Sequence, residues 1–419
     1  MFTADKFGLI LLQLSLLFAF SAPCAAMERR RDQFIKEPGH YIVAVPISYP
    51  GIGQGIAAIG VNANAHDSYT DYGLFILGGD FEGIGGVVTD MHLIEKTLIA
   101  EVALEKLNKA AVFSYNSRGM ENGKDDYNIL EVDKVEATIA RLRGTFQNRM
   151  FEVQSLLVNN TFHLSGFRDK DGNLLLDTSN SADIEQQFFM LGFQADWTDD
   201  YQDPRKGLRY EFSRWWGGET TPDAPDYYQQ EHNLTAYLPI GRISTWAFNY
   251  FRSDAIVERE GDTDFDSVSA RMDLNCPSLS GAQRLQCEQL VNNTIAHNRY
   301  GTAASMGGPS RLRSYPQGRY QGAHTIFYGT EIRWNLTEEF QPFDIVIAKD
   351  IRTGIQLSAF WETASVADTK DQLGNIWRDS YGLGMRLVMT SGIVFRAEIA
   401  DGDEGSNIVM FFNYPWAGY

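Results

Sequence analysis

Short segments that alternate apolar residues with polar or small ones run through almost the whole chain. The pattern is clear after position 324, where an apolar row alternates with a row that contains Glu331 and Arg333. Successive side chains of a β-strand point to opposite faces, so a period of two predicts strands. Charges of both signs do not suit a dry core, but they suit a strand with one face in water and the other in lipid. The apolar row consists of Ile326, Tyr328, Ile332, Trp334 and Leu336.

No apolar run beyond residue 26 reaches the ~20 residues that a membrane-spanning helix needs. Since backbone polar groups must be bonded inside a bilayer, a membrane protein of this kind can only be a closed barrel. About eleven strand-like segments precede residue 252 and about five follow residue 323, which predicts an all-β, antiparallel transmembrane barrel of about 16 strands. The barrel is expected over 41–419, with residues 255–323 as one long loop. The final strand is expected to keep Tyr414 and Trp416 on its apolar row.

One segment leaves its secondary structure open. Residues 127–143 combine an alternating pattern with apolar residues at helical spacing, namely Ile129, Val132, Val135 and Ile139. Helix and strand are equally compatible with that pattern.

The N-terminus, 1–26, is typical of a secretory signal peptide, with a charged start, an apolar core and small residues before the cleavage point after Ala26. The apolar core of about a dozen residues is shorter than the ~20 of a spanning helix, which disfavours a membrane anchor. Ser21 stands where a lipoprotein signal usually has an aliphatic residue, which disfavours a lipid anchor on Cys24. Cleavage would leave a short periplasmic segment, 27–40, before the barrel. The expected location is the outer membrane of a Gram-negative bacterium.

Charge and residue spacing exclude several kinds of site. The net charge of -18 argues against nucleic acid, whose phosphates require a basic face. Acidic residues gather at 199–203 and 401–404, where a solvated loop rim is favoured over loose binding of divalent ions. Residues 169–173 match the start of a calcium loop but lack the closing glutamate, so a hairpin tip is favoured. The seven histidines show no metal-ligand spacing. We therefore expect no metal and no cofactor.

The cysteines and the missing catalytic motifs give two further expectations. Cys276 and Cys287 lie close together in a secreted chain, which favours a loop disulfide over free thiols. Neither a phosphate-binding GxxxxGK nor a nucleophile-elbow GxSxG is present, and no serine, histidine and aspartate set can be assembled at a rim. We therefore expect no catalytic residue and no enzyme.

The most specific motif is the segment LRSYPQGRY at 312–320. It resembles the sixth extracellular loop of the bacterial surface-antigen and outer-membrane assembly-factor superfamily, the BamA- and TamA-type barrels. In that family an Arg-Gly-aromatic tip and a following Gly-Arg-Tyr fold back into the lumen. The resemblance covers roughly residues 197–416 of this sequence. It implies that the loop-plug motif consists of Arg313, Ser314, Tyr315, Gly318, Arg319 and Tyr320.

The resemblance also implies a partner for the loop on the barrel wall. In the family the tip arginine pairs with the acidic residue of a Phe-x-Asp-x-Gly pattern on the thirteenth strand, and the matching positions here are Phe360, Glu362 and Ala364. The sequence departs from the family at Ser314 and Ala364, which replace glycines, and Glu362 has a longer arm than aspartate. An isolated buried charge is expensive, so an arginine inside a barrel needs a carboxylate. We expect Arg313 and Glu362 to hold the plug; a loop facing solvent is the alternative.

The resemblance implies a role in outer-membrane biogenesis or transport, with the loop plug gating the lumen. A passive pore or a structural surface antigen is the alternative. Family members that handle protein substrates carry POTRA domains before the barrel, and 27–40 is too short for one, so a POTRA-less member is expected. The expected partners are outer-membrane lipids, lipopolysaccharide and other outer-membrane proteins, and the barrel is expected to be a monomer.

Overall fold

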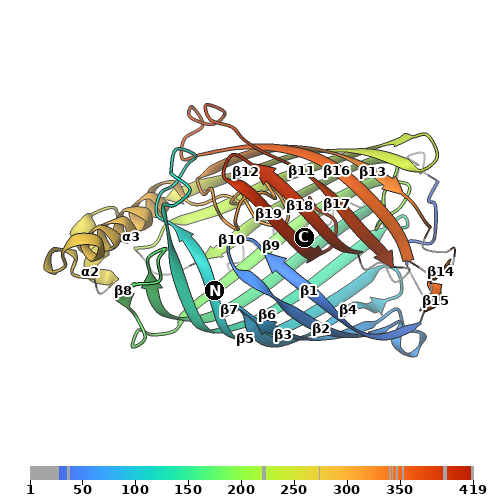
Figure 1. The fold of residues 1–419 in the computed structure, drawn as a ribbon, viewed down its shortest axis with the longest axis horizontal. Helices are drawn as coiled ribbons and strands as arrows, with labels where there is room; N and C mark the ends of the chain where they lie inside the picture. Colours follow the sequence, from blue (N-terminus) through green and yellow to red (C-terminus); the bar gives the residue numbers. More distant parts are fainter. Residues whose placement is uncertain are drawn as a thin grey trace.

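Sixteen antiparallel strands form one closed wall in the computed structural model, which describes residues 28–34, 38–218, 223–272, 274–338, 341, 343–345, 348–351, 353–389 and 394–416 (Figure 1). Eleven of these strands precede the long loop and five follow it, so the predicted strand count is confirmed. The predicted signal peptide lies outside the described residues. The wall strands are β1 (Gly39–Tyr49), β2 (Gly53–Ala63), β3 (Asp71–Gly79), β4 (Glu82–Ile94), β5 (Leu98–Tyr115), β6 (Tyr127–Phe146), β7 (Phe151–Arg168), β9 (Ile184–Thr198), β10 (Gly207–Gly218), β11 (Asp226–Ile240), β12 (Ser244–Arg259), β13 (His324–Asn335), β16 (Thr353–Ala367), β17 (Arg378–Met389), β18 (Val394–Gly402) and β19 (Gly405–Phe412).

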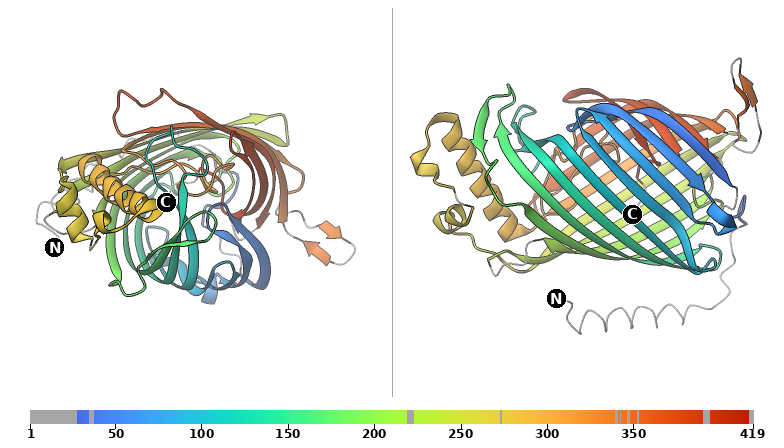
Figure 2. Two further views of the ribbon diagram at one scale, coloured as in Figure 1. Left: turned by 60° about the vertical axis from the view of Figure 1, so that its left-hand side comes forward. Right: turned by 90° about the horizontal axis from the view of Figure 1, so that it is seen from below.

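The strands pair in chain order around the wall, and β19 pairs with β1 to close it. The wall has two different ends, which the side view separates (Figure 2). We call the end that carries the long β12–β13 connection the loop end, and the opposite end, which carries residues 28–34, the turn end. The smaller elements are β8 (Leu174–Asp177), η1 (Ala65–Asp67), α2 (Phe265–Arg271), η2 (Cys276–Ser278), α3 (Gly281–Tyr300) and the hairpin β14 (Phe343–Ile345) and β15 (Ala348–Ile351). None of the described helices is long and apolar enough to cross a membrane.

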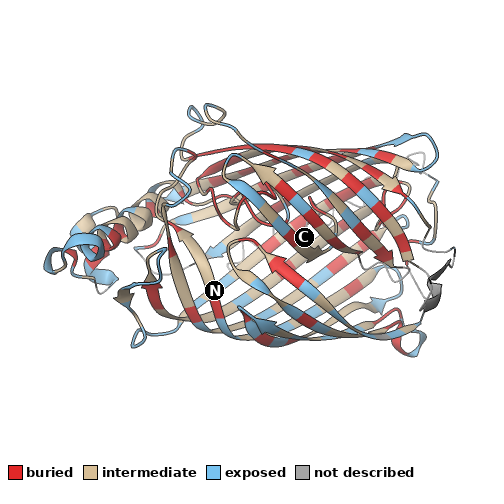
Figure 3. Cartoon of the chain, viewed as in Figure 1, coloured by how far each residue is buried: buried red, intermediate tan, exposed pale blue. Residues whose placement is uncertain are grey.

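Buried and exposed residues alternate along the strands, as the sequence pattern predicted (Figure 3). On β17, Leu383 is 67% exposed on the outer face, whereas Arg386 is fully buried on the inner face. On β18, Ile399 is exposed and Glu398 is buried in the same way. The apolar row therefore faces outward, and the charged row faces the lumen.

Residues 127–143, for which helix and strand were equally compatible, belong to the strand β6. β6 pairs along its length with both β5 and β7, and this pairing on two sides decides against a helix. The long loop begins after Arg259 because β12 continues to that residue, a few positions beyond the expected start near 255.

The closure between the first and last strands is short. β1 and β2 share eleven register pairs, whereas β1 and β19 share one, Ser48 with Met410. β19 ends at Phe412, and Asn413 turns the chain inward with a φ of 65°. The expectation that Tyr414 and Trp416 lie on the outer row of the final strand is therefore wrong. Asparagine tolerates a left-handed backbone better than most residues, and it is the local signal for the turn.

Candidate functional site

The connection between β12 and β13 consists of a small helical head and a returning segment. The head contains α2, η2 and α3, which pack around their own apolar cluster. Cys276 and Cys287 are joined by a disulfide that ties η2 to α3. Residues 301–323 then return toward the lumen, where Met306 and Tyr320 pair as an isolated bridge.

Arg313 lies inside the wall with its side chain fully buried. Its backbone N–H and its Nε each donate to Glu362 on β16 over 3.0 Å. Its Nη1 donates to Glu398 on β18 over 2.8 Å and to Glu331 on β13 over 3.3 Å. The guanidinium carbon lies 3.4 Å from the centre of the Phe360 ring. The two residues that the resemblance paired are thus in contact, and two further glutamates share the arginine.

Three arginines of the wall lie beside the same glutamates. Arg386 bonds both Glu331 and Glu398, Arg396 bonds Glu398, and Arg333 bonds Glu331. With Glu362 included, the described part of the wall contributes three arginines and three glutamates to this cluster, and the loop adds a fourth arginine. The wall alone is therefore balanced in charge, and the seated loop leaves one positive charge in excess. We call this set the lumen cluster.

The wall accommodates the two positions at which this sequence departs from the family glycines. The backbone N–H of Ser314 donates to Ser380 Oγ over 2.9 Å. A Cβ on Gly402 would overlap Ser314 Oγ, so glycine at 402 leaves room for the serine. Ala364 and Tyr315 are both fully buried in one apolar cluster. The tip is thus packed against the wall without either family glycine.

The companion triplet makes a second set of contacts nearer the loop end. Gly318 has a φ of 67° and turns the chain. Arg319 donates to both carboxylate oxygens of Glu404, over 2.6 and 2.8 Å, and to Asn122 Oδ1 over 2.6 Å. Tyr320 also donates to Glu404. The prediction of a purely solvated rim at 401–404 is therefore wrong for Glu404, because this carboxylate pairs with a buried arginine.

The same prediction is wrong for the acidic segment 199–203 at the turn end. Asp200 and Asp203 are each 1% exposed. Asp203 pairs over 3.1 Å with Arg205, two residues away, and with Arg30, which is remote in the sequence. These partners bury the acid, and no local pattern in the sequence points to Arg30.

Sequence reasoning also missed the contribution of the chain's C-terminal residues to the lumen. Trp416 is 2% exposed, and its Nε1 donates to Glu362 Oε1 over 2.7 Å. Its backbone oxygen accepts from Asn233 Nδ2 over 2.9 Å. A Cβ on Gly329 would lie 2.7 Å from the Trp416 ring, so glycine on β13 makes room for it. Glu362 therefore has a second partner besides Arg313.

A further arginine that the sequence did not single out fixes the loop at the rim. Arg118, in the β5–β6 connection, pairs with Asp368 over 2.7 Å. It also donates to the backbone oxygen of Gly301 and to Thr302 Oγ1, which lie at the end of α3. One side chain thus links two rim connections to the loop.

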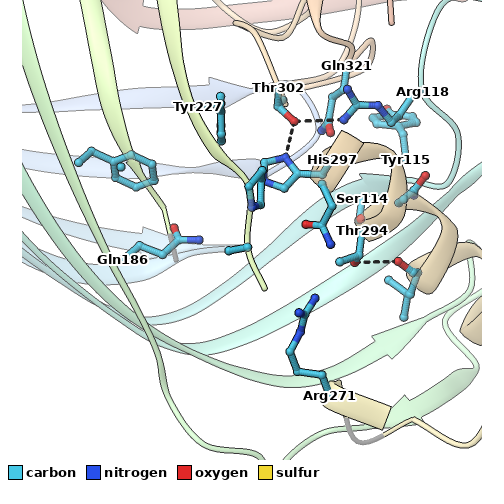
Figure 4. A pocket seen from close by; sticks show the side chains of 17 residues that line it. Ser114, Tyr115, Arg118, Gln186, Tyr227, Arg271, Thr294, His297, Thr302 and Gln321 are labelled. Atoms are coloured by element: carbon cyan, nitrogen blue, oxygen red, sulfur yellow. Dashed lines mark hydrogen bonds between the residues drawn. The ribbon is translucent and has the colours of Figure 1, made fainter. Parts of the chain in front are cut away.

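A cavity of about 430 Å³ lies between α3 and the wall at the loop end (Figure 4). Its lining includes Arg118, Arg271 and polar side chains, and among the described residues no carboxylate. His297 Nδ1 lies 2.8 Å from Thr302 Oγ1. Burial, together with nearby Arg118, lowers the pKa of His297 to about 4, so this side chain is neutral at pH 7.

No family model and no curated protein matches the chain. Among solved structures, CdiB from Escherichia coli matches with a TM-score of 0.51 and 10% identity over 91% of this chain and 69% of its own. CdiB from Acinetobacter baumannii gives a TM-score of 0.46 at 9% identity, over 91% of this chain and 66% of its own. BamA from Haemophilus ducreyi lacking POTRA domains 1-3 gives 0.45 at 11% identity, over 91% and 75%. The chain thus has the barrel fold that the sequence resemblance implied.

Proposed function

We propose that this barrel, which shares the fold of CdiB, is an outer-membrane protein that acts in membrane biogenesis or transport, with the β12–β13 loop as a plug of its lumen. Outer-membrane barrels have short periplasmic turns and longer extracellular loops. On that rule the loop end faces the cell exterior and the turn end faces the periplasm. The outward apolar row would contact lipid.

The observation that carries this proposal is the charge balance of the lumen cluster. The wall arginines already have glutamate partners on the wall, so withdrawal of Arg313 does not leave them unpaired. Glu362 keeps the Trp416 N–H as a donor. The described wall of the lumen cluster stays neutral overall when the plug leaves, which suits gating. Loss of the arginine partners of Glu362 and Glu404 is the cost that keeps the plug seated, because an unpaired buried charge is expensive.

The short seam between β1 and β19 supports biogenesis over simple passage of solutes. Apart from the pair Ser48 and Met410, the described residues of β1 have no register partner on β19. Pro46 also lies in β1, and proline is tolerated in strands mainly at edges, since it has no N–H to donate. A wall that is weakly joined at one position can part there with little loss of hydrogen bonds.

Single-channel recording in planar bilayers tests the plug. We expect Arg313→Gln to increase the mean conductance several-fold over wild type, because the loop loses its bonds to three glutamates. Arg284→Gln is the matched control, since Arg284 lies on α3 of the same loop and pairs with Glu288 at the helix surface. Equal conductance of the two variants would show that the loop is not a gate.

A seam lock separates biogenesis from a passive pore. Ser48→Cys/Met410→Cys places two cysteines at the one register pair of the seam. We expect oxidation of this variant to abolish its acceleration of the insertion of a urea-unfolded eight-stranded barrel into liposomes, and reduction to restore it. Wild type with and without reductant controls for the native disulfide. No acceleration by wild type, with conductance unaffected by the lock, would favour the passive pore or structural antigen.

A further inference from the structure

Residues 28–34 lie across the turn end of the barrel, where we call them the strap. The strap leads to β1, and β9 is the eighth strand around a wall of sixteen, so β1 and the β9–β10 turn stand on opposite sides. Phe34 packs with Tyr69 of the β2–β3 connection and Ile99 of β5. Gln33 Oε1 accepts from the backbone N–H of Tyr201 in the β9–β10 turn, over 2.7 Å. The strap thus contacts both sides of the opening.

Other connections at the turn end also contact the strap. Arg29 donates to the backbone oxygen of Asn148 in the β6–β7 turn. Lys96 of the β4–β5 turn lies 5.7 Å from the centre of the Phe34 ring. Arg30 lies 4.0 Å from Glu338, which follows β13. The strap thus contacts the connections from β2–β3 to β9–β10 and the one that follows β13, which places it across the opening rather than beside it.

Three consecutive arginines hold the strap in an acidic cradle at the end of β9 and in the β9–β10 turn. Arg29 pairs with Asp196 over 3.3 Å and donates to the backbone oxygen of Thr198 over 2.8 Å. Arg30 pairs with Asp200 and Asp203, and Arg31 with Asp200. The backbone N–H of Arg30 donates to the oxygen of Asp199 over 2.6 Å. Both side chains and backbone therefore fix the strap in position.

The cradle needs the strap for its charge balance. Among the described residues, Asp196, Asp199, Asp200, Asp203 and Glu338 form ion pairs with only two arginines of the barrel itself, Arg205 and Arg209. Without the strap, three negative charges are uncompensated, and Asp196 and Asp203 are almost fully buried. The three strap arginines balance the set. Guanidinium groups suit this site because they form several directed bonds to carboxylates.

We propose that the acidic cradle is a docking site for an extended arginine-rich segment, that the strap occupies it in cis, and that this docking closes the periplasmic mouth of the lumen. The proposal goes beyond the loop plug and rests on the proposed function only for the orientation of the barrel and for a lumen that conducts. The mouth would then be a second gate that opens independently of the loop, so the mean conductance depends on the product of two open probabilities and rises when either gate is lost.

Limited trypsin digestion of the full-length protein in detergent tests the docking, because trypsin cuts after arginine. We expect cleavage after Arg30 and Arg31 to be at least ten-fold faster in Asp200→Asn/Asp203→Asn than in wild type. The matched control is Asp169→Asn/Asp171→Asn, which makes the same charge change at an exposed turn of the loop end. Equal cleavage rates in wild type and the cradle variant would overturn the docking.

Conductance in planar bilayers tests the closure and does not depend on the cradle variant folding. We expect Arg29→Gln/Arg30→Gln/Arg31→Gln to conduct several-fold more than the control Arg168→Gln/Arg242→Gln/Arg284→Gln, which removes the same charge from two exposed positions and one half-buried position on the strand β7. A synthetic peptide of residues 27–34, added on the turn side, should lower the conductance of the strap variant, and the same peptide with glutamine for arginine should not.

The outcomes distinguish this proposal from the loop plug. Equal conductance of the strap variant and its control, or no effect of the arginine peptide, would overturn the closure. A strap effect in a protein whose Arg313→Gln variant behaves like its own control would leave the strap proposal standing and remove the loop gate.

Discussion

The lumen cluster and the strap cradle use the same chemistry with opposite charge balance. In the lumen cluster the wall is balanced alone, and the seated loop adds one positive charge in excess. In the cradle the barrel alone carries an excess of three negative charges among the described ion-paired residues, and the three strap arginines neutralise it, although Glu28 and Asp32 bring the net charge of the strap to +1. The comparison indicates that withdrawal of the loop breaks the ion pairs of Glu362 and Glu404 but leaves the wall neutral, whereas withdrawal of the strap leaves the cradle with a net negative charge.

Burial separates the two regions as well. Arg313 and its three glutamates are fully buried, whereas the side chains of Arg30 and Arg31 are 21% and 20% exposed. Buried ion pairs are screened little by solvent, and partly exposed pairs are screened more. The loop tip is thus held by directed ion pairs that are buried from solvent. The strap is held by attraction to an excess of opposite charge at a partly exposed site.

The largest effect is expected from a change that breaks the balance of the lumen cluster. Glu398→Gln leaves four arginines facing two glutamates, and loss of one partner of a buried ion pair costs about 3–5 kcal/mol. We expect Arg313→Gln added to Glu398→Gln to recover part of this loss, because the excess charge then returns to one. Urea unfolding of the four proteins of this cycle in lipid measures the coupling, and strictly additive losses would contradict the charge balance given above.

An intermediate effect is expected from acid on the cradle. Burial raises the pKa of Asp203, but Arg205 and Arg30 outweigh burial and lower it from 3.8 to about 2; Tyr414 also bonds this carboxylate. A depressed pKa gives stability that is present above about pH 4 and is lost as the pH falls toward 2. We therefore expect wild-type conductance to rise between pH 4 and pH 2.

The matched protein for this titration is Asp203→Asn, whose conductance should already be raised at pH 7 and should change less on acidification. A rise centred near pH 6 in wild type would point to another group and would weaken the assignment to the cradle. If Arg313→Gln raises the conductance at every pH and keeps the acid transition, the transition belongs to the cradle and not to the lumen cluster.

The smallest effect is expected from the disulfide of the helical head. Cys276→Ser/Cys287→Ser should leave the conductance and the urea midpoint of the barrel unchanged, because the bond closes a short loop outside the wall. The head itself should become more sensitive to trypsin at Arg271 and Arg284. A change in conductance as large as that of Arg313→Gln would mean that the head and the plug move as one unit.

The wall was predictable from the sequence because its information is local. The alternation of Leu383 and Ile399 with Arg386 and Glu398 repeats along each strand, and a period of two is legible without knowing which strands are neighbours. The same period gave a wrong prediction at the C-terminus, since Trp416 continues the apolar row in the sequence and was therefore placed on the outer face. The left-handed turn at Asn413 and the room made by Gly329 take it inside.

The two charged sites differed in how far they could be predicted. Arg313 and Glu362 were paired through a resemblance, whereas Glu331 and Arg333 were assigned only to the water-facing side of their strand. The strap was missed because Arg30 and Asp200 are 170 residues apart in the sequence and neither belongs to a periodic pattern. A run of three arginines in a chain with more acids than bases was the one available signal.

The inward turn at the C-terminus has a consequence for the order in which this barrel is built. Trp416 ends up enclosed by the wall, beneath a loop whose tip bonds the same glutamate. The tail follows directly from β19, whereas the loop tip can leave and return through the loop end of a closed wall. Trp416 is therefore expected to reach Glu362 as β19 takes its place, before the loop tip docks on the same carboxylate.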